Sequence, residues 1–349
     1  MSKKLRAGIL AATGTIGQRF VQLLANHPNF ELTALAASSN SAGKTYREAC
    51  AWQLSSDPPA NIADMTVHEC TPDLECDVIF SALPTDQARD LEPVFALAGY
   101  KVFTNASAYR MQDNVPLLIP EVNPSHLQLV RSQATFSSGG FIAANPNCSA
   151  AVVVTALAPL HQAFGVRAVI VNTMQALSGA GYPGVPSLDS LDNVIPYIPN
   201  EEEKMADETR KMLGTIMDGH LHDASMKFSA HCNRVPTRDG HIETVSVALE
   251  RSASLEEILN VWREWKPVPQ QLGLPTAPHP VIAVRSEVNR PQTRLDRDAG
   301  NGMTVTIGRL RSCEVLDYKF VALAHNAMRG AAGGSVLNAE LALAQGYLG

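Results

Sequence analysis

The sequence lacks the features that mark secreted, membrane-spanning and disulfide-rich proteins. Its six cysteines are scattered through 349 residues without a C-x-x-C pair, a pattern typical of thiols in a reducing compartment. The long apolar stretch AAVVVTALAPL is shorter than the roughly 20 residues that span a bilayer. The first residues, MSKKLRAGILAATG, contain no small-residue cleavage site, so we expect no signal peptide. The expected location is the cytoplasm.

Positive charge is also scarce. The formal net charge is -6 and the pI is near 5.9, which argues against a surface for nucleic acid or anionic membranes because such surfaces need clustered lysine and arginine. Hydrophobic residues make up 45% of the chain and charged residues 18%, which is typical of a globular protein with about two domains. We expect small-molecule ligands.

The first half of the chain alternates buried strands with helices. The near-continuous apolar run 5–12 is typical of a strand buried on both faces of a parallel sheet. An amphipathic helix follows it and stops before Pro28. Further strands are predicted at 31–38, 77–83 and 101–107. This order predicts an α/β domain with a Rossmann-type, doubly wound parallel sheet.

The second half contains six strand-like segments and few helices apart from 255–265. It predicts an α+β domain with a mixed, largely antiparallel sheet that is covered by helices on one face. The Ala- and Leu-rich C-terminal segment is helical in period, and we expect it to pack on the first domain. The predicted domains are therefore 1–147 with 325–349, and 148–324.

A glycine-containing turn lies between the first strand and the first helix. The segment ATGTIG at 12–17 has the context of a dinucleotide-binding turn, in which pyrophosphate approaches the backbone at a helix N-terminus. Ala11 stands where the usual pattern has its first glycine. The second strand ends in AASSNS at 36–41, with hydroxyls and no carboxylate, which favours NADP over NAD. A plain turn and a serine-rich surface loop are the alternatives.

Cys148 lies at the polar edge of an apolar helical run, in the string NPNCSAAVVV. The unpaired N–H groups and the dipole at a helix N-terminus stabilise a thiolate, which is the nucleophilic form of cysteine. The alternative is that a neighbouring Asn or Ser caps the helix and the sulfur is incidental. A dinucleotide site in the same chain favours a reaction in which a thiolate adds to a carbonyl and the adduct exchanges hydride with nicotinamide.

Such an enzyme needs a general acid/base and a cation for a charged substrate. His241 follows the turn VPTRDG and Arg234 precedes it, so we expect a hairpin that places both side chains at one rim of the sheet. A metal site at His220, His222 and the adjacent pair His231-Cys232 is the competing hypothesis. No defined ligand spacing supports it, and we expect no metal.

Five separate strings, in order along the chain, resemble the aspartate-β-semialdehyde dehydrogenase family, specifically its archaeal and fungal branch. The resemblance implies NADPH-dependent reductive dephosphorylation of L-4-aspartyl phosphate to L-aspartate 4-semialdehyde and phosphate, in the biosynthesis of lysine, threonine and methionine. It also implies a homodimer or a dimer of dimers. The strings are NPNCS (145–149), MQALSGAGYPG (174–184), DNVIPYIPNEEEKMADETRKML (192–213), NRVPTRDGHIETVSV (233–247) and HNAMRGAAGGSVLNAE (325–340).

The resemblance also implies roles for individual residues. Cys148 would be the nucleophile and His241 the acid/base. The implied substrate and phosphate contacts are Arg110, Asn147, Gln175, Glu201, Lys204 and Arg234. The implied NADP contacts are Thr13, Gly14, Thr15, Ile16, Gly17, Ser38, Ser39, Ser81, Leu83, Ser178, Gly179 and Asn326. Glu201 and Lys204 are one helical turn apart, so an ordinary surface ion pair is the alternative for them.

Two other functions remain open at this point. Malonyl-CoA reductase is similar in fold and shares the cysteine, but it needs a pocket for CoA. A catalytically silent NADP-binding regulator needs no such combination of cysteine, glutamine, arginine and histidine. We therefore predict the NADPH-dependent reduction of aspartyl phosphate.

Overall fold

The computed structural model describes residues 3–348, which form two compact units. Among these residues the first unit comprises 3–118, 125–145 and 331–348, and the second comprises Ile119–Pro124 and Pro146–Gly330.

The first unit is built on a parallel sheet of six strands in the order β3-β2-β1-β4-β5-β6. The order reverses between β1 and β4, the point at which doubly wound folds bind their ligands. The predicted Rossmann-type sheet is therefore confirmed, with β3 and β6 as additional strands. The elements of this unit are β1 (Leu5–Leu10), α1 (Thr15–Leu24), β2 (Phe30–Ala37), α2 (Tyr46–Ala49), α3 (Ala60–Ala63), β3 (Val67–Glu69), β4 (Val78–Ser81), α4 (Thr85–Leu97), β5 (Lys101–Thr104), β6 (Phe141–Ala144) and α11 (Gly333–Ala344).

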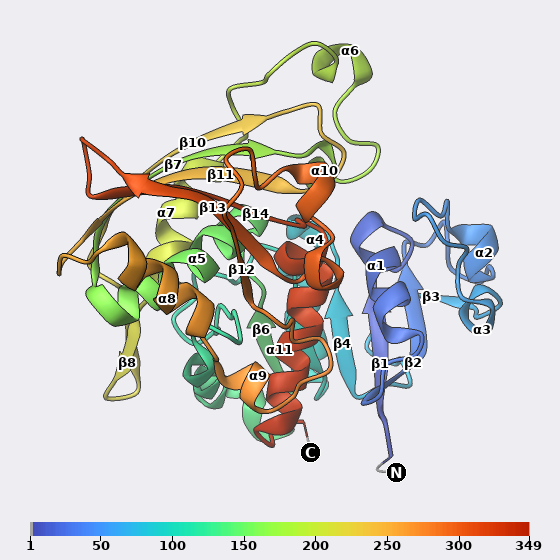
Figure 1. Cartoon of the computed structure of the whole chain (residues 1–349). Coiled ribbons are helices and arrows are strands. Elements are labelled where there is room, and N and C mark those ends of the chain that lie inside the picture. The colour runs from blue at the N-terminus through green and yellow to red at the C-terminus, as the bar shows by residue number, and fades with distance from the viewer. Residues whose placement is uncertain (1–2, 349) are drawn as a thin grey trace. The chain divides into compact units, whose positions relative to one another are not determined.

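The C-terminal helix α11 belongs to this unit and packs on α1 and β5, as the sequence predicted (Figure 1). A buried pair joins it to the start of β2, because Nε2 of His27 lies 2.7 Å from Oε1 of Glu340. Nδ1 of His27 accepts the N–H groups of Asn29 and Phe30 at 3.2 Å. The returning C-terminus therefore completes the core of the first unit.

The second unit is built on a mixed sheet in the order β10-β7-β11-β14-β13-β12. Its three central pairs are antiparallel, and the outer pairs β10/β7 and β12/β13 are parallel. The predicted mixed, largely antiparallel sheet is confirmed. The elements are α5 (Cys148–Phe164), β7 (Val166–Gln175), α6 (Ser187–Ser190), α7 (Glu201–Met212), β8 (Thr215–Met217), β9 (His220–His222), β10 (Lys227–Arg234), β11 (His241–Leu249), α8 (Leu255–Glu264), α9 (Val268–Gln271), β12 (Ile282–Arg285), α10 (Thr293–Asp296), β13 (Val305–Ser312) and β14 (Tyr318–Ala324).

Helices α5, α7 and α8 pack on one face of this sheet (Figure 1). Helix α5 is almost entirely buried because its sequence is apolar on every side. On the other face, β7 presents Ile170 and Asn172, both exposed. The segment that carries α6 extends away from the sheet, with Tyr182 and Leu188 exposed.

The predicted hairpin between Arg234 and His241 is wrong. Strand β10 ends at Arg234 and β11 begins at His241, but β7 lies between them in the sheet. Because Arg234 pairs with Gln175 and Ile242 pairs with Met174, the three site residues Arg234, Gln175 and His241 still meet at one end of the sheet. The position of β7 between β10 and β11 could not be predicted from the sequence, because β7 ends more than 50 residues before β10 begins.

Within residues 3–348, no helix is both long and apolar enough to cross a membrane. The same residues contain no group of three or more His, Cys, Asp or Glu side chains that could hold a metal ion. His220 and His222, on the short strand β9, are both exposed.

Candidate active site

Cys148 is the first residue of α5 and is partly exposed. The side chain of Asn147 caps this helix, because its Oδ1 accepts the N–H groups of Ser149 at 2.9 Å and Ala150 at 3.1 Å. The capping interpretation of NPNCS is therefore correct. It does not make the sulfur incidental, since the cap leaves Cys148 at the positive end of a helix of 17 residues.

The sulfur of Cys148 lies 3.2 Å from Nε2 of His241. The other ring nitrogen, Nδ1, accepts the backbone N–H of Ala176 at 3.0 Å. Burial lowers the pKa of His241 to about 3, and the positive charge of Arg234 acts in the same direction. The imidazole is therefore neutral at pH 7, with its proton on Nε2 and directed at the sulfur.

Glu201 connects two of the predicted substrate residues. Its Oε1 accepts Nδ2 of Asn147 at 2.8 Å and Nε2 of Gln175 at 3.0 Å. Gln175 ends β7 and Glu201 begins α7, so these contacts fix both amide side chains beside the nucleophile. Glu201 is only 7% exposed. The alternative interpretation, a surface ion pair, is therefore wrong for this residue.

Glu208 is a site residue that the sequence analysis missed. Its Oε2 accepts the backbone N–H of Asn147 at 2.6 Å, and it is 1% exposed. It follows Glu201 by seven residues, which is two helical turns, so both carboxylates lie on the buried face of α7. This seven-residue spacing is the feature of the sequence that could have predicted a role for Glu208. Two carboxylates on one helix thus hold the residue that precedes Cys148.

Arg234 lies beside this group and is buried. Its guanidinium donates to the carbonyl oxygen of Ala176 at 2.9 Å. Burial lowers the pKa of Arg234 and the nearby charges of Cys148 and Glu201 raise it, but an arginine remains charged at neutral pH. A Cβ on Gly179 would lie 2.8 Å from Nη1 of Arg234 and 3.1 Å from Cε1 of His241. A larger residue at this position would therefore displace the guanidinium of Arg234 or the ring of His241.

Three residues predicted to contact the cofactor lie in this second unit. Nδ2 of Asn326 donates to Oγ of Ser178 at 2.8 Å, and Oδ1 of Asn326 accepts the N–H of Gly240 at 2.9 Å. Asn326 therefore connects the segment of Ser178 and Gly179 to the turn before His241.

Glu243 is a second site residue that the sequence analysis missed. It lies two residues after His241 on β11, so both side chains project from the same face of the strand. Burial raises the pKa of Glu243 well above its ordinary value, the charge of Glu201 raises it further, and the hydroxyl of Ser149 lowers it. Burial therefore favours the neutral form of this carboxyl group, two residues from His241 on the same strand.

A buried ion pair supports the other side of Cys148. The two terminal nitrogens of Arg329, Nη1 and Nη2, donate to Glu121 at 3.0 and 2.8 Å, and both residues are 2% exposed. Arg329 belongs to the π-helical turn η5 (Met328–Ala332), a geometry frequent at functional sites. A Cβ on Gly330 would lie 2.6 Å from Cβ of Cys148, so this turn packs directly on the nucleophile.

Two of the residues predicted to bind substrate or phosphate, Lys204 and Arg110, take no part in the hydrogen bonds described above. Lys204 lies one turn after Glu201 on α7 and is half-buried. Arg110 belongs to the first unit, where its guanidinium donates to the carbonyl oxygen of Asn105 at 2.7 Å.

The first unit has a cavity of about 400 Å³. Five of the residues predicted to bind the cofactor line it, namely Thr13, Gly14, Ser38, Ser39 and Leu83. It lies at the N-terminus of α1, where the N-cap Gly14 supplies no side-chain cap and no acidic residue occupies the first turn. The hydroxyl of Thr15 is buried there without a hydrogen-bond partner among residues 3–348. These groups fit a dinucleotide phosphate, which would accept the N–H groups and the hydroxyl.

The other predicted cofactor residues of this unit, Ile16, Gly17 and Ser81, surround the turn. A Cβ on Gly17 would lie 2.3 Å from the carbonyl oxygen of Ala11, so glycine is required at this position. Ser81 is fully buried, and its hydroxyl accepts the N–H of Leu83 at 3.5 Å. Ala11 has φ 57°, the left-handed conformation in which its methyl group is strained.

The cavity also contains an acidic residue that the sequence analysis did not foresee. Glu69 ends β3 and lines the cavity together with Ser38 and Ser39. The prediction considered only the end of β2, where a ribose-binding carboxylate usually lies. Because β3 is paired with β2, it brings a carboxylate to the same edge of the sheet.

Comparisons with known proteins give matches over both halves of the chain. One family model, described as the NAD binding domain of semialdehyde dehydrogenase, matches residues 6–130, and another, described as its dimerisation domain, matches residues 157–329. The chain is 51% identical to aspartate-semialdehyde dehydrogenase of Archaeoglobus fulgidus over 336 residues, which is 96% of each chain. It is 46% identical to the enzyme of that name from Cryptococcus neoformans over 360 residues, 99% of this chain and 98% of the other.

Among solved structures, a similar one is the crystal structure of aspartate semialdehyde dehydrogenase with NADP from Candida albicans. Its TM-score is 0.92 at 42% identity, and the comparison covers 99% of this chain and 100% of that chain.

Proposed function

The chain belongs to the aspartate-semialdehyde dehydrogenase family, in its archaeal and fungal branch, and we propose that it reduces L-4-aspartyl phosphate to L-aspartate 4-semialdehyde with NADPH. The products include NADP and inorganic phosphate. The observation that carries this proposal is the pair formed by Cys148 and His241, 3.2 Å apart at the N-terminus of a buried helix. The reaction belongs to the biosynthesis of lysine, threonine and methionine.

Cys148 acts as the nucleophile in this proposal. Its sulfur attacks the acyl carbon of aspartyl phosphate, the carbon–oxygen bond to phosphate breaks, and a thioester forms. The dipole of α5 and the N–H of His241 stabilise negative charge on the sulfur before the attack. The same N–H faces the sulfur when the tetrahedral adduct later collapses to the aldehyde.

The side chains around this pair bind and orient the substrate. The guanidinium of Arg234 is buried beside Cys148, whereas that of Arg329 is paired with Glu121, and the planar fork of Arg234 suits the substrate α-carboxylate. Glu201, already oriented by Asn147 and Gln175, is suited to the substrate ammonium. Lys204 and Arg110 are proposed to bind phosphate.

The first unit, proposed as the dinucleotide-binding domain, holds NADP at the N-terminus of α1. Bound NADPH supplies the hydride that reduces the thioester. The N–H groups after Gly14 and the Thr15 hydroxyl bind the pyrophosphate, and Ser38 and Ser39 donate to the 2′-phosphate. In the second unit, Ser178, Gly179 and Asn326 are proposed to contact the nicotinamide end.

The second unit matches the family's dimerisation domain. The sheet face that presents Ile170 and Asn172 is the surface we assign to the homodimer. A dimer of dimers is the further proposal. The six cysteines are all thiols outside disulfides, which supports a cytoplasmic location.

A phosphate-dependent assay tests the function. Aspartate semialdehyde and NADP should yield NADPH only when inorganic phosphate, or arsenate as its analogue, is present. Parallel reactions with NAD measure cofactor preference, and reactions with malonyl-CoA and NADPH test the alternative reductase. Oxidation without phosphate, or activity with malonyl-CoA alone, would contradict the proposal. The relatives' names do not favour malonyl-CoA reductase or a non-catalytic regulator.

A further inference from the structure

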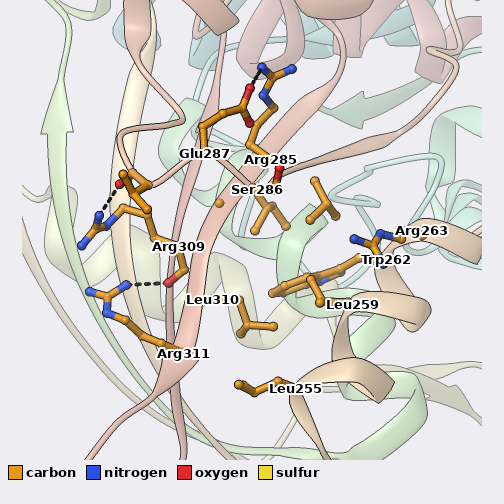
Figure 2. Close-up of a pocket in the computed structure, with 14 residues that line it drawn as sticks. Leu255, Leu259, Trp262, Arg263, Arg285, Ser286, Glu287, Arg309, Leu310 and Arg311 are labelled. Carbon is orange, nitrogen blue, oxygen red and sulfur yellow. Dashed lines mark hydrogen bonds and ion pairs between the residues drawn. The ribbon is translucent and has the colours of Figure 1, made fainter.

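Two cavities in the described chain differ in whether their hydrogen-bonding groups already have partners. The cavity between α8 and the strands β12 and β13 has a volume of about 450 Å³ (Figure 2). On its rim the guanidinium of Arg285 is bonded to Glu287, and that of Arg309 to the carbonyl oxygen of Val288, so both charges already have acceptors. The cavity at the N-terminus of α1, in the first unit, instead lies beside donors that lack an acceptor.

Tyr46 holds the buried side of the turn that lines the α1 cavity. This residue begins α2 and is fully buried, and its hydroxyl donates to the carbonyl oxygen of Ala12 at 3.0 Å. The peptide bond between Ala12 and Thr13 is trans, so its carbonyl oxygen and its N–H group point in opposite directions. The bond to Tyr46 therefore turns the N–H of Thr13 away from the core, on the side where Thr13 lines the cavity.

The next peptide of the turn is held by Gln18 of α1. Gln18 is 2% exposed, and its Nε2 donates to the carbonyl oxygens of Thr13 at 3.0 Å and Ala51 at 3.1 Å. Its Oε1 accepts the N–H of Gln53 at 2.7 Å, so the side chain is fixed at both ends. Two successive carbonyl oxygens of the turn are thus bonded on its buried side.

The N–H of Thr13 remains as a donor at the cavity. It has no hydrogen-bond acceptor among residues 3–348, whereas the N–H of Gly14 donates to the carbonyl oxygen of Ala11 at 3.1 Å. Backbone N–H groups at the start of a helix bind phosphate oxygens when they point at the ligand. Thr13 supplies such a group beside the N-terminus of α1.

The turn needs support from outside because its first residue is strained. Ala11 has φ 57°, a conformation that is unfavourable for a residue with a Cβ and natural for glycine. Glycine at this position would adopt the conformation without help. With alanine, hydrogen bonds from the surrounding structure must offset the strain.

We propose that Tyr46 and Gln18 are positioning residues for NADP, because their hydrogen bonds hold the strained turn so that the N–H of Thr13 faces the pyrophosphate. Neither Tyr46 nor Gln18 lines the cavity, so both act through the backbone of the turn. The inference rests on the proposed function only for the placement of NADP at α1. A different substrate would leave it intact, since the test below measures dinucleotide binding directly.

The test uses Tyr46→Phe and Gln18→Met, which remove the hydrogen bonds and nearly keep the side-chain size. Calorimetric titration should show NADP binding weakened about five- to tenfold in each variant, because a displaced N–H loses its phosphate contact. Turnover of aspartate semialdehyde at saturating NADP should stay within about twofold of the wild type, so the kinetic effect appears in the KM for NADP. Adenosine 2′-phosphate, which lacks the pyrophosphate, should bind with unchanged affinity.

Tyr100→Phe and Gln133→Met are matched controls in the same unit. The hydroxyl of Tyr100 donates to the carbonyl oxygen of Leu74 at 2.8 Å. Nε2 of Gln133 donates to the carbonyl oxygens of Asn114 at 2.9 Å and Ile142 at 2.7 Å. None of these residues lines the α1 cavity. Both controls should lower the thermal stability, as the test variants do, while the affinity for NADP stays within about twofold of the wild type.

Three results would overturn the proposal. One is wild-type affinity for NADP in both Tyr46→Phe and Gln18→Met. Another is an equal loss of affinity in the two control variants, which would show that binding only follows overall stability. The third is an equal loss for NADP and adenosine 2′-phosphate, because the defect would then lie outside the pyrophosphate turn.

Discussion

The backbone N–H of Ala176 donates to Nδ1 of His241 at 3.0 Å. This contact assigns the tautomer of the imidazole, because a nitrogen that accepts a hydrogen bond carries no proton. The remaining proton is on Nε2, 3.2 Å from the sulfur of Cys148. At neutral pH His241 therefore faces the sulfur of Cys148 as a hydrogen-bond donor. The backbone N–H of Ala176 selects this tautomer.

Replacing Cys148 by serine should reduce turnover by more than about 1,000-fold, because the covalent step loses its nucleophile. The affinity for NADP should change less than about twofold, since the cavity at α1 is in the other unit. Cys313 is a suitable control. Its pKa is lowered first by the backbone N–H of Leu316, and it lies outside the active site. Cys313→Ser should keep full turnover, and residual activity in Cys148→Ser would contradict the covalent mechanism.

The buried, neutral state of His241 predicts an acid-sensitive fold. The pKa of His241 is about 3 in the folded chain and about 6.5 when unfolded, so the unfolded state binds the proton first as the pH falls. The stabilising contribution is complete above pH 6.5 and is lost progressively below it. Between pH 7 and pH 5 the wild type should lose about 2 kcal/mol relative to His241→Asn.

Urea unfolding of both proteins at the two pH values measures this difference. The comparison is needed because Glu243 has the opposite effect. Its raised pKa gives stability that is complete below the unfolded pKa and is lost as the pH rises. A parallel pH dependence in wild type and His241→Asn would show that the histidine is not buried neutral.

Glu208 should stabilise the segment before the nucleophile. Glu208→Gln replaces a charged acceptor of the Asn147 N–H by a neutral one and should cost about 1 to 3 kcal/mol of unfolding free energy. Glu203→Gln on the same helix is the control, because Glu203 is exposed, and it should cost less than about 0.5 kcal/mol. Chemical denaturation measures both. Equal effects would show that the contact with Asn147 contributes nothing specific.

Ala11→Gly should relieve the strain of the nucleotide-binding turn. The position has φ 57°, where glycine has no Cβ to clash, and the expected gain is about 1 kcal/mol. Ala12→Gly should instead lower the free energy of unfolding, because Ala12 is fully buried and has no positive φ. Thermal unfolding distinguishes the two. A loss of stability in Ala11→Gly would mean that the methyl group packs favourably in the cavity.

Glu69 should weaken the preference for NADP. Its carboxylate lines the same cavity as Ser38 and Ser39 and repels a 2′-phosphate. Because Glu69 is exposed, Glu69→Gln should raise the affinity for NADP only about two- to fivefold and leave NAD nearly unchanged. Titration of both dinucleotides gives the ratio. Glu31→Gln, at the other end of β2, should alter neither affinity.

The sequence by itself determined the local structure and the chemistry. The apolar run at Leu5–Leu10 predicts a buried parallel strand, and the polar residues before the apolar helix α5 place Cys148 at its N-terminus. These features depend on residues a few positions apart, whose periodicity and capping are visible in the chain. The strings around Cys148 and His241 were specific enough to predict the family.

The tertiary structure decided which of these residues meet. Strand β7 enters between β10 and β11 and places Gln175 between Arg234 and His241. The pairing of β3 with β2 brings Glu69 to Ser38 and Ser39. Strand order depends on loop closure and on the burial of complete sheet faces, which involve residues far apart in the chain. For the same reason the neutral state of His241 became visible only once its burial and the N–H of Ala176 were known.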